Sequence, residues 1–289
     1  MSEPIKKVAA IHDLSGFGRG SLTAIIPTLS AMGIQVCPLP TAVLSNHTGY
    51  ESFSYVDLTS SMQDYINEWK KLNLNFECIY SGYLGSYEQV KIVSDFIDDF
   101  KTKDTLVVVD PVMADDGVLY SKFDFDFVEY MNKLVKKADI ITPNFTEAMF
   151  LLGNKQCPSN ISDNELKQIL VELSNIGPEM VVLTSVPDIM EPNNIITAVY
   201  DKVQNKFYKI PCKHIPVYYA GTGDVFASVM IGGLLNGDSL QKSVTKSVDF
   251  LYKSISDSQQ YDYDKMNSIV LEKDLHFLND FVNHQCIEF

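Results

Sequence analysis

Positive charge and long hydrophobic runs are scarce in this sequence. Its 289 residues include 23 Lys and Arg against 37 Asp and Glu, which gives a net charge of -14 at pH 7. Such an acidic chain argues against a nucleic-acid or anionic-membrane surface, although a local basic pocket is still allowed. No apolar run approaches the roughly 20 residues of a membrane span, and the N-terminus lacks a signal-peptide pattern. We therefore expect neither nucleic acid nor membrane among the partners.

Paired cysteines are also absent. The cysteines are odd in number, scattered and without a C-x-x-C pair, at Cys37, Cys78, Cys157, Cys212 and Cys286. This pattern predicts free thiols in a reducing compartment rather than disulfides or a structural zinc site. We expect the protein in the cytoplasm.

What the chain does have is the composition of a globular protein, with 46% hydrophobic and 21% charged residues. Its length allows one large α/β domain or two smaller ones. No internal repeat or low-complexity linker divides it. We expect a single domain over residues 1–289 with an acidic, aromatic tail that begins near residue 257.

The most informative stretch is Ala220–Asp224, in which a glycine-rich turn leads into a long apolar run that ends at Asn236-Gly237. The pattern predicts a buried helix of about four turns. A helix start offers unpaired N–H groups and partial positive charge to an anion, and Gly221 and Gly223 let the backbone approach it closely. Asp224 is then either a base beside the anion or only the N-cap of the helix. The pentapeptide leaves these alternatives equally open.

Apolar runs and helical periodicity alternate along the rest of the chain, which predicts a mostly parallel sheet covered by helices on both faces. The expected strands are Val8–Ile11, Ile34–Leu39, Cys78–Tyr80, Thr105–Val109, Ala138–Ile141, Val181–Leu183 and a hairpin of Ile195–Tyr200 with Phe207–Ile210. The expected helices are Ser21–Met32, Leu58–Leu72, Glu88–Phe100, Phe127–Val135, Phe145–Leu152, Asn160–Ser174, Asp238–Ser256, capped by Asp238, and Leu271–Val282.

Polar residues follow four of these strands, at Asp13, Asp110, Asn144 and Thr184. Ligands of open α/β sheets bind at the carboxyl ends of strands, so we expect these residues and the glycine turn to share one edge. Asn144 and Glu147 also have the spacing of a capping box, which by itself could account for both. The glycines after the first strand run G-x-G-x-G rather than G-x-G-x-x-G, which argues against a dinucleotide site.

These residues resemble the ribokinase superfamily. Gly221-Thr222-Gly223-Asp224 looks like its anion-hole signature, and Thr142-Pro143-Asn144-Phe145-Thr146-Glu147 looks like its N-x-x-E element. Three further segments are similar to the pyridoxal kinase branch: Ser45–Thr48, Ser81–Ser86 and Asp110–Met113. The resemblance implies a three-layer αβα sandwich with a central, mostly parallel sheet and an antiparallel edge hairpin.

The resemblance also implies ATP-dependent phosphorylation of pyridoxal, pyridoxine or pyridoxamine. Asp224 would be the general base, and the N–H groups of Gly221, Thr222 and Gly223 would stabilise charge on the transferred phosphoryl group. Asp13, Thr48 and Tyr83 would line the substrate pocket, and the loop around Asn46 would close over it.

The nucleotide side is implied in the same way. Asn144 and Glu147 would organise Mg²⁺, mainly through waters, with Asp110 near the metal and phosphates. The other residues expected to contact the nucleotide are Asp116, Thr142, Thr184 and Ser185. The resemblance further implies a homodimer, and it leaves open a requirement for a monovalent cation such as K⁺.

Two positions depart from the pyridoxal kinase pattern. Asp13 stands where a serine is expected against the pyridine nitrogen, and Ala114 stands where a glycine is expected. Asp13 keeps a hydroxymethylpyrimidine kinase open as an alternative, whereas a sugar or nucleoside kinase leaves the pocket segments unexplained. A non-catalytic ligand sensor is the remaining alternative, and the intact Asp224 argues against it.

Overall fold

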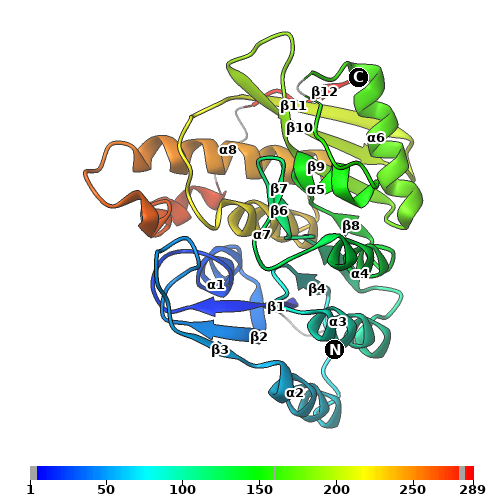
Figure 1. Cartoon of the computed structure of the whole chain (residues 1–289), viewed down its shortest axis with the longest axis vertical. Helices are drawn as coiled ribbons and strands as arrows, with labels where there is room; N and C mark the ends of the chain where they lie inside the picture. Colours follow the sequence, from blue (N-terminus) through cyan, green and yellow to red (C-terminus); the bar gives the residue numbers. More distant parts are fainter. Residues whose placement is uncertain (1–4, 159, 280–283) are drawn as a thin grey trace. The chain divides into compact units, whose positions relative to one another are not determined.

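The computed structural model describes residues 5–158, 160–279 and 284–289. The chain forms two compact units, each assembled from two stretches of sequence. Unit 1 takes in the described residues of Met1–Thr105 and Ile215–Asn283, and unit 2 those of Leu106–His214 and His284–Phe289. Each unit has its own strands and helices (Figure 1).

Unit 1 is built around a buried parallel strand. Its strands lie in the order β4 (Cys78–Ser81), β1 (Lys7–Ser15), β2 (Gln35–Leu44) and β3 (Tyr55–Asp57). β1 runs parallel to both β4 and β2, and β3 runs antiparallel to β2. Because β1 has a partner on either side, its residues Val8–Ile11 are fully buried.

The helices of unit 1 come from both stretches of its sequence. They are α1 (Leu22–Ala31), α2 (Thr59–Lys71), α3 (Tyr87–Phe100), α7 (Thr222–Leu235), α8 (Leu240–Ser258) and the short α9 (Leu271–Asp274). α1 packs against β1 and β2, and α7 packs against α1 and α8. α7 is apolar on all sides and nine of its residues are buried, as a helix enclosed by its neighbours requires. The predicted helix after the glycine turn is confirmed.

Unit 2 combines parallel strands with an antiparallel hairpin. Its strand order is β12 (Ile287–Glu288), β11 (Lys206–Lys213), β10 (Asn194–Asp201), β9 (Met180–Pro187), β8 (Ile140–Ile141) and β5 (Leu106–Val109). β5, β8 and β9 are parallel, whereas β9, β10, β11 and β12 pair antiparallel. A separate ribbon joins β6 (Ala114–Asp115) to β7 (Val118–Leu119). The helices are α4 (Phe125–Val135), α5 (Phe145–Leu151) and α6 (Asp163–Ile176).

The predicted α/β class, with mostly parallel strands and an antiparallel hairpin, is confirmed in these elements. Several local predictions are wrong. The first strand continues past Ile11 to Ser15 and includes Asp13, and β9 continues past Leu183 to Pro187 and includes Thr184. The second strand continues past Leu39 to Leu44. α8 is capped by Ser239, because the carboxylate of Asp238 pairs instead with Lys242 and Lys246. The tail helix is a single turn, α9, followed by a 3₁₀ segment, η2 (Leu275–Asn279), and the rest of the predicted range lies outside the described residues.

Among the helices formed by the described residues, none is long and apolar enough to cross a membrane.

Candidate functional site

The substrate side of the predicted site lies at the carboxyl edge of the strands of unit 1. Asp13 lies near the C-terminal end of β1, and Tyr83 follows β4. The loop 45–54 joins β2 to β3. Burial, together with the charges of Tyr55 and Asp13, raises the pKa of Tyr83 to about 12, so Tyr83 lies within electrostatic range of both. Asp13 and Tyr83 thus lie at the ends of neighbouring strands at the same edge of unit 1, and their roles in the substrate pocket stay predictions.

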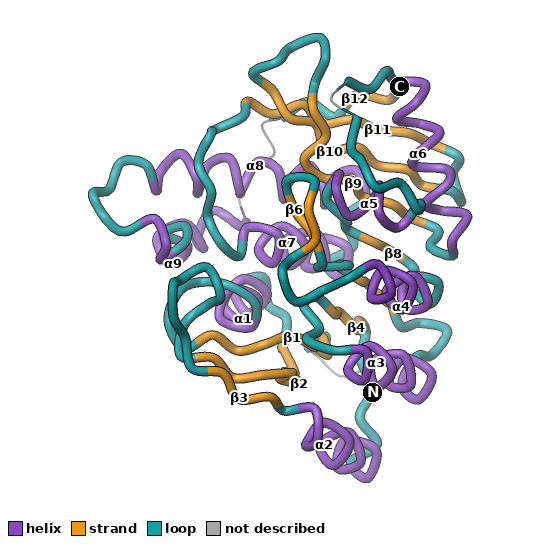
Figure 2. The backbone as a smooth tube through the Cα atoms, in the orientation of Figure 1, coloured by secondary structure: helices purple, strands orange, loops and turns teal. Residues whose placement is uncertain are grey.

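Loops 16–21 and 45–54 lie side by side at this edge (Figure 2). The N–H of Gly16 donates to the carbonyl of Leu44 at 2.8 Å, and the N–H of His47 donates to the carbonyl of Phe17 at 3.4 Å. Asn46 shapes its own loop, because its side-chain amide donates to the carbonyl of Ser52 at 2.9 Å. Thr48 is exposed. The pocket roles of Asn46 and Thr48 stay predictions.

The glycine turn requires glycine at one position. Gly221 has a φ of 79°, and a Cβ there would stand 2.1 Å from the carbonyl oxygen of Arg19. Gly221 is also the N-cap of α7, so Asp224 lies inside the first helical turn with Thr222 and Gly223. The alternative in which Asp224 serves only as the N-cap is therefore wrong.

Asp224 is held in a setting suited to a general base. The N–H of Ser21 donates to its Oδ2 at 2.7 Å, and its side chain is 15% exposed. The pKa of Asp224 is raised to about 7. Burial is the main cause, the charge of Asp13 acts in the same direction, and the hydrogen bond from Ser21 partly opposes them. A carboxyl group with a pKa near neutrality can both accept and release a proton at physiological pH.

Asp13 is connected to the same network. Its Oδ1 accepts a hydrogen bond from the hydroxyl of Ser21 at 2.6 Å, and its Oδ2 accepts one from Ser15 at 3.3 Å. Burial raises the pKa of Asp13, and both serine hydroxyls lower it. Ser21 thus contacts the predicted ring-binding carboxylate and the predicted base at once.

Sequence reasoning missed His12. Its ring is fully buried, with Nδ1 3.7 Å from Oδ1 of Asp224 and its centroid 4.3 Å from that of Tyr80. Burial lowers the pKa of His12 to about 3, so the imidazole beside the base is neutral. Its position directly before Asp13 in a strand that ends at the site was the available signal.

The tail segment 264–272 was also missed, and it touches both substrate loops. His47 contacts the carbonyl of Met266 through Nε2 at 2.5 Å, and the N–H of Gly49 donates to His47 Nδ1, which makes Nε2 the protonated nitrogen. The hydroxyl of Tyr50 donates to the side-chain oxygen of Asn267 at 2.7 Å. Aromatic and polar residues in a tail were too general a signal to assign this role.

The only arginine of the chain, Arg19, completes this contact. Its Nη1 donates to the carbonyl of Asn267 at 2.9 Å, and its Nε pairs with Glu272 at 2.6 Å. The hydroxyl of Ser268 donates to the carbonyl of Ala220, next to the glycine turn. The tail segment 264–272 therefore binds loop 16–21, loop 45–54 and the start of the turn.

The predicted nucleotide side lies in unit 2. The N-cap Asn144 and Glu147 of α5 form the predicted capping box, with each side chain accepting from the other's backbone N–H at 2.9 Å. Glu147 also accepts from the N–H of Met113 at 3.0 Å, and Asn144 donates to the carbonyl of Ala114 at 2.8 Å. The box therefore holds the segment after Asp110, and Ala114 is accommodated there as a buried residue.

The other predicted nucleotide residues follow or lie within parallel strands of the same unit. Asp110 and Thr142 come directly after β5 and β8, and both are buried. Thr184 bridges to Asn144, while Ser185 is exposed with a φ of 60° at an irregularity in the β9–β10 pairing. Asp110, Thr142 and Thr184 therefore come from neighbouring parallel strands of unit 2, and their role in nucleotide binding stays a prediction. Asp116 lies on the exposed β6–β7 turn, where the N–H of Gly117 donates to the hydroxyl of Thr146 in α5 at 3.0 Å.

The donor set at this edge fits a hard cation that is held mainly through water. No described group of three His, Cys, Asp or Glu side chains could hold a metal ion. Oxygen donors are nevertheless concentrated there, and the Oγ1 of Thr142 is buried without a hydrogen bond to any described residue. Burial raises the pKa of Glu147 to about 8, so a neighbouring cation would favour its charged form. Mg²⁺ commonly keeps several waters and binds substrate phosphates.

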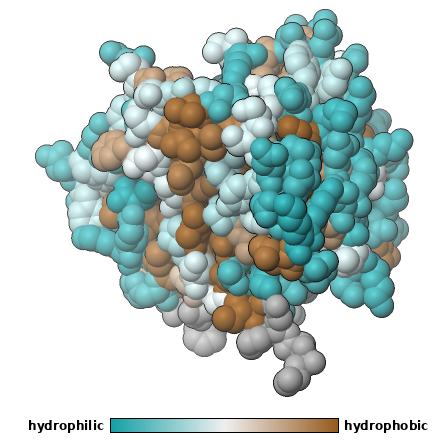
Figure 3. Space-filling model, turned by 90° about the horizontal axis from the view of Figure 1, so that it is seen from below, coloured by the Kyte–Doolittle hydropathy of each residue, from teal (hydrophilic) through white to brown (hydrophobic). Residues whose placement is uncertain are grey.

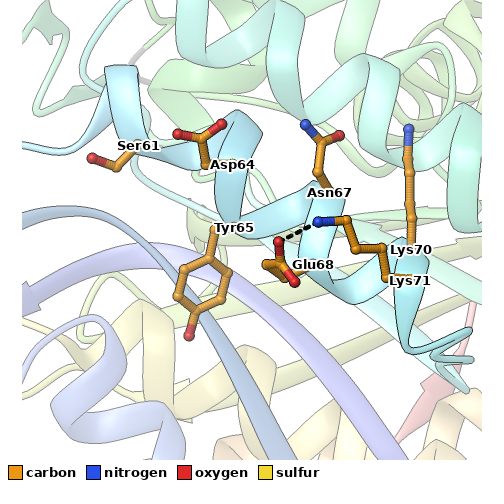
Figure 4. Close-up of a pocket in the computed structure, with 7 residues that line it drawn as sticks. All are labelled: Ser61, Asp64, Tyr65, Asn67, Glu68, Lys70 and Lys71. Carbon is orange, nitrogen blue, oxygen red and sulfur yellow. Dashed lines mark hydrogen bonds and ion pairs between the residues drawn. The ribbon is translucent and has the colours of Figure 1, made fainter.

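A surface pocket of unit 1 is lined by α2 and by none of the predicted site residues (Figure 4). Its side chains include Asp64, Tyr65 and the ion pair between Glu68 and Lys71. This pocket therefore lies outside the site built from the sequence.

Known proteins resemble the chain along most of its length. The family model for phosphomethylpyrimidine kinase matches residues 16–269. The pyridoxal kinase of Dictyostelium discoideum is 30% identical over 265 residues, which are 87% of this chain and 86% of that protein. The pyridoxal kinase of Arabidopsis thaliana is 28% identical over 271 residues, 89% of this chain and 84% of the relative.

Solved structures share the fold. A Bacteroides thetaiotaomicron protein, provisionally described as a phosphomethylpyrimidine kinase and solved in a crystal form with pyridoxal, is 48% identical with a TM-score of 0.93 over 98% of this chain and 100% of its own. Pyridoxal kinase from Lactobacillus plantarum is 29% identical, with a TM-score of 0.86 over 94% of this chain and 96% of its own. These matches confirm the predicted ribokinase-type fold.

Proposed function

The chain belongs to the phosphomethylpyrimidine kinase family, and within it we propose that the protein phosphorylates the 5′-hydroxyl of a B6 vitamer with ATP. The substrates are pyridoxal, pyridoxine or pyridoxamine. The observation that carries the proposal is the network in which Ser21 contacts both Asp13 and Asp224 beside the glycine turn. The names of the relatives, and the Bacteroides thetaiotaomicron crystal form with pyridoxal, support the same substrate class.

Asp224 acts as the general base in this proposal. It takes the proton of the substrate hydroxyl as that oxygen bonds to the γ-phosphorus, and the bond between the γ-phosphorus and the β–γ bridging oxygen breaks to release ADP. Gly221, Thr222 and Gly223 present backbone N–H groups of the helix start to the phosphoryl oxygens. The pKa of Asp224, raised by burial to about 7, matches proton transfer near neutral pH.

Asp13 recognises the ring of the substrate. A carboxylate can form an ion pair with a protonated pyridine nitrogen. A serine hydroxyl is neutral and can offer that nitrogen only a hydrogen bond. Tyr83, near Asp13, supplies an aromatic wall of the substrate pocket. Loop 45–54, with Asn46 and Thr48, covers the substrate and excludes water from the phosphoryl group.

Residues of unit 2 hold the nucleotide and its metal. The proposed contacts come from Asp110, Asp116, Thr142, Asn144, Thr184 and Ser185, and Mg²⁺ is held mainly through water by Glu147, Asn144 and Asp110. When bound, Mg²⁺ offsets negative charge on the phosphates. A monovalent cation such as K⁺ is a further proposed cofactor, tested by replacing K⁺ with tetramethylammonium in the assay.

The alternative substrate is hydroxymethylpyrimidine. The name of the matching family supports this alternative. Asp13 is compatible with it, because the pyrimidine ring, like the pyridine ring of the B6 vitamers, offers a nitrogen to a polar side chain. A non-catalytic ligand sensor is disfavoured by the intact base and glycine turn, whose geometry serves transfer rather than binding alone.

We also propose a homodimer. The outer strand β3 of unit 1 and its neighbourhood expose apolar side chains, with Val43 at 38%, Phe53 at 43% and Val56 at 55% exposure. Hydrophobic residues gather between hydrophilic ones on the face shown in Figure 3. Light scattering coupled to size exclusion measures the mass directly, and a mass near the 32.5 kDa of one chain contradicts the dimer.

The cytoplasm is the proposed location. No described cysteine forms a disulfide, and four of the five are partly accessible, at Cys37, Cys157, Cys212 and Cys286, which suits a reducing compartment.

A substrate panel tests the function. Pyridoxal, pyridoxine, pyridoxamine and hydroxymethylpyrimidine are incubated separately with MgATP, and the products are identified by mass spectrometry. The proposal predicts a 5′-phosphate from at least one B6 vitamer. Phosphorylation of the pyrimidine alone assigns the alternative, and nucleotide binding without any product supports a sensor.

A further inference from the structure

Ser21 has a backbone conformation that residues with a Cβ rarely adopt. Its φ is 49° and its ψ is -133°, at the entry to α1. Such a conformation persists in a side-chain-bearing residue only where the surroundings impose it, and such positions cluster at functional sites. Ser21 also forms an isolated antiparallel bridge with Leu14, which ties it to the end of β1.

The usual reason for a serine at a helix entry does not apply here. Ser21 occupies the N-cap position of α1, yet among the described residues its side chain makes no capping hydrogen bond. Its hydroxyl donates instead to Oδ1 of Asp13 at 2.6 Å, while its N–H donates to Oδ2 of Asp224 at 2.7 Å. The unusual backbone therefore directs two donors to two different carboxylates.

We propose that Ser21 is a positioning residue that fixes the ring-binding carboxylate of Asp13 and the general base Asp224 relative to each other. It does not touch the reacting atoms. By holding both groups, it sets where the substrate ring lies with respect to the base that receives the hydroxyl proton. This inference rests on the proposed function, because it concerns the same site.

Two carboxylates held by one residue also influence each other's ionisation. The Ser21 hydroxyl lowers the pKa of Asp13, and the negative charge of Asp13 raises the pKa of Asp224. Removing the hydroxyl raises the pKa of Asp13, so less negative charge acts on Asp224 and its pKa falls. The acid limb of the kcat/KM profile then moves to lower pH.

The other groups around the pair come from four elements. His12 of β1 faces Asp224 but is neutral, since burial lowers its pKa to about 3. Ser15 donates a hydrogen bond to Asp13, and His47 of loop 45–54 accepts from the N–H of Gly49 through Nδ1, so its ring is neutral. Tyr83 after β4 and Tyr55 of β3 lie within electrostatic range of Asp13, and burial raises the pKa of both to about 12. Neither tyrosine nor His12 titrates in the range in which Asp224 does.

Two substitutions separate the hydroxyl from the backbone. Ser21→Ala removes the hydroxyl and keeps the unfavourable backbone, whereas Ser21→Gly removes the hydroxyl and allows the backbone without strain. Both variants are expected to lower kcat/KM for the vitamer by at least about tenfold while the KM for ATP stays constant. Both shift the acid limb to lower pH. The Tm of Ser21→Gly is expected to equal or exceed that of the wild type.

Ser239→Ala is the matched control, because Ser239 is an N-cap whose hydroxyl does accept a hydrogen bond, from the N–H of Lys242 at 3.2 Å. It is expected to lower the Tm and leave kcat/KM and the pH profile unchanged. If Ser21→Ala does not fold, Ser21→Gly carries the test alone.

The inference about Ser21 is overturned if a folded Ser21→Gly variant keeps the kcat/KM and the acid limb of the wild type. Turnover of a B6 vitamer by the wild type upholds the proposed function in that case. Absence of turnover by the wild type on every B6 vitamer overturns the proposed function instead. A Tm of Ser21→Gly well below the wild type contradicts the backbone argument.

Discussion

At the scale of the residue, two carboxylates in unlike roles dominate this protein. Asp224 sits in the first turn of a buried helix and Asp13 at the end of a buried strand, and burial raises the pKa of each. The sequence indicated both positions, because each follows a recognisable strand or turn. For His12 the only signal was its position next to Asp13, and for Ser21 there was none, because its importance comes from a contact with Asp224 far along the chain and from a backbone angle.

The first prediction concerns the ring contact. Asp13→Ser replaces a carboxylate that can pair with a protonated ring nitrogen by a neutral hydroxyl. We expect the ranking of pyridoxal, pyridoxine and pyridoxamine by kcat/KM to change, with the KM for ATP unaffected, in steady-state assays of each vitamer. Equal changes in the KM for vitamer and for ATP would remove Asp13 from the ring contact.

The second prediction concerns pH. Because Asp224 must be ionised to accept a proton and its pKa is raised to about 7, kcat/KM for the vitamer is expected to rise with pH through about 7 and then level off. A pH–rate profile between pH 5 and pH 8.5, with the pH dependence of the substrate's own titration subtracted, measures this. An acid limb at the usual carboxyl range, near about 4, contradicts a raised pKa for the base.

At the scale of the element, most strands and helices could be predicted because their patterns are local. The capping box of α5 and the β10–β11 hairpin are examples. The end of β2 could not, because Pro38 and Pro40 suggest a stop. β2 pairs with β1 at both prolines, but it pairs with β3 only from Ala42 onward, so the prolines interrupt no β2–β3 pairing.

The third prediction compares two capping boxes. Glu147 is buried and holds Met113 and Asn144, whereas Glu165 forms the same box at the exposed start of α6. Glu147→Gln is expected to lower the free energy of unfolding by about 1–3 kcal/mol and to raise the Mg²⁺ concentration for half-maximal activity. Denaturant titration and a Mg²⁺ titration measure the two effects.

Glu165→Gln is the control for this comparison. It is expected to cost less than about 1 kcal/mol, because its partners stay hydrated, and to leave the Mg²⁺ requirement unchanged. Equal Mg²⁺ curves for the Glu147→Gln variant and the wild type contradict a role for Glu147 near the metal.

The fourth prediction concerns the tail segment 264–272. The hydroxyl of Tyr50 reaches Asn267, whose carbonyl also accepts from Arg19, so both substrate loops depend on this segment. Tyr50→Phe and Asn267→Ala are each expected to raise the KM for the vitamer, and their effects in the double variant are expected to be less than additive. Tyr65→Phe, at an exposed tyrosine of α2, serves as the control. Fully additive effects contradict the shared hydrogen bond.

At the scale of the whole molecule, the proposed roles divide between the two units. The base, the glycine turn and the ring contact are in unit 1, and the nucleotide and metal residues are in unit 2. The order of the short motifs along the chain did not indicate this division, because residues of unit 1 come from both ends of the sequence. The single domain expected over residues 1–289 stays a prediction, since each unit is compact in itself.

This division makes the central claim testable without disturbing the nucleotide residues. Asp224→Asn retains the size and polarity of the side chain but cannot accept the proton, so turnover is expected to fall by roughly 10²–10⁴-fold. Because the nucleotide residues are in the other unit, binding of ADP measured by calorimetry is expected to stay unchanged.

The most direct measurement is therefore ADP release with MgATP and the best B6 vitamer, for the wild type, Asp224→Asn and the control Asp238→Asn. Asp238 is an aspartate that pairs with Lys242 and Lys246 rather than with the site. The account predicts that turnover is lost in Asp224→Asn and kept in Asp238→Asn. Turnover of Asp224→Asn within about tenfold of the wild type contradicts its assignment as the general base.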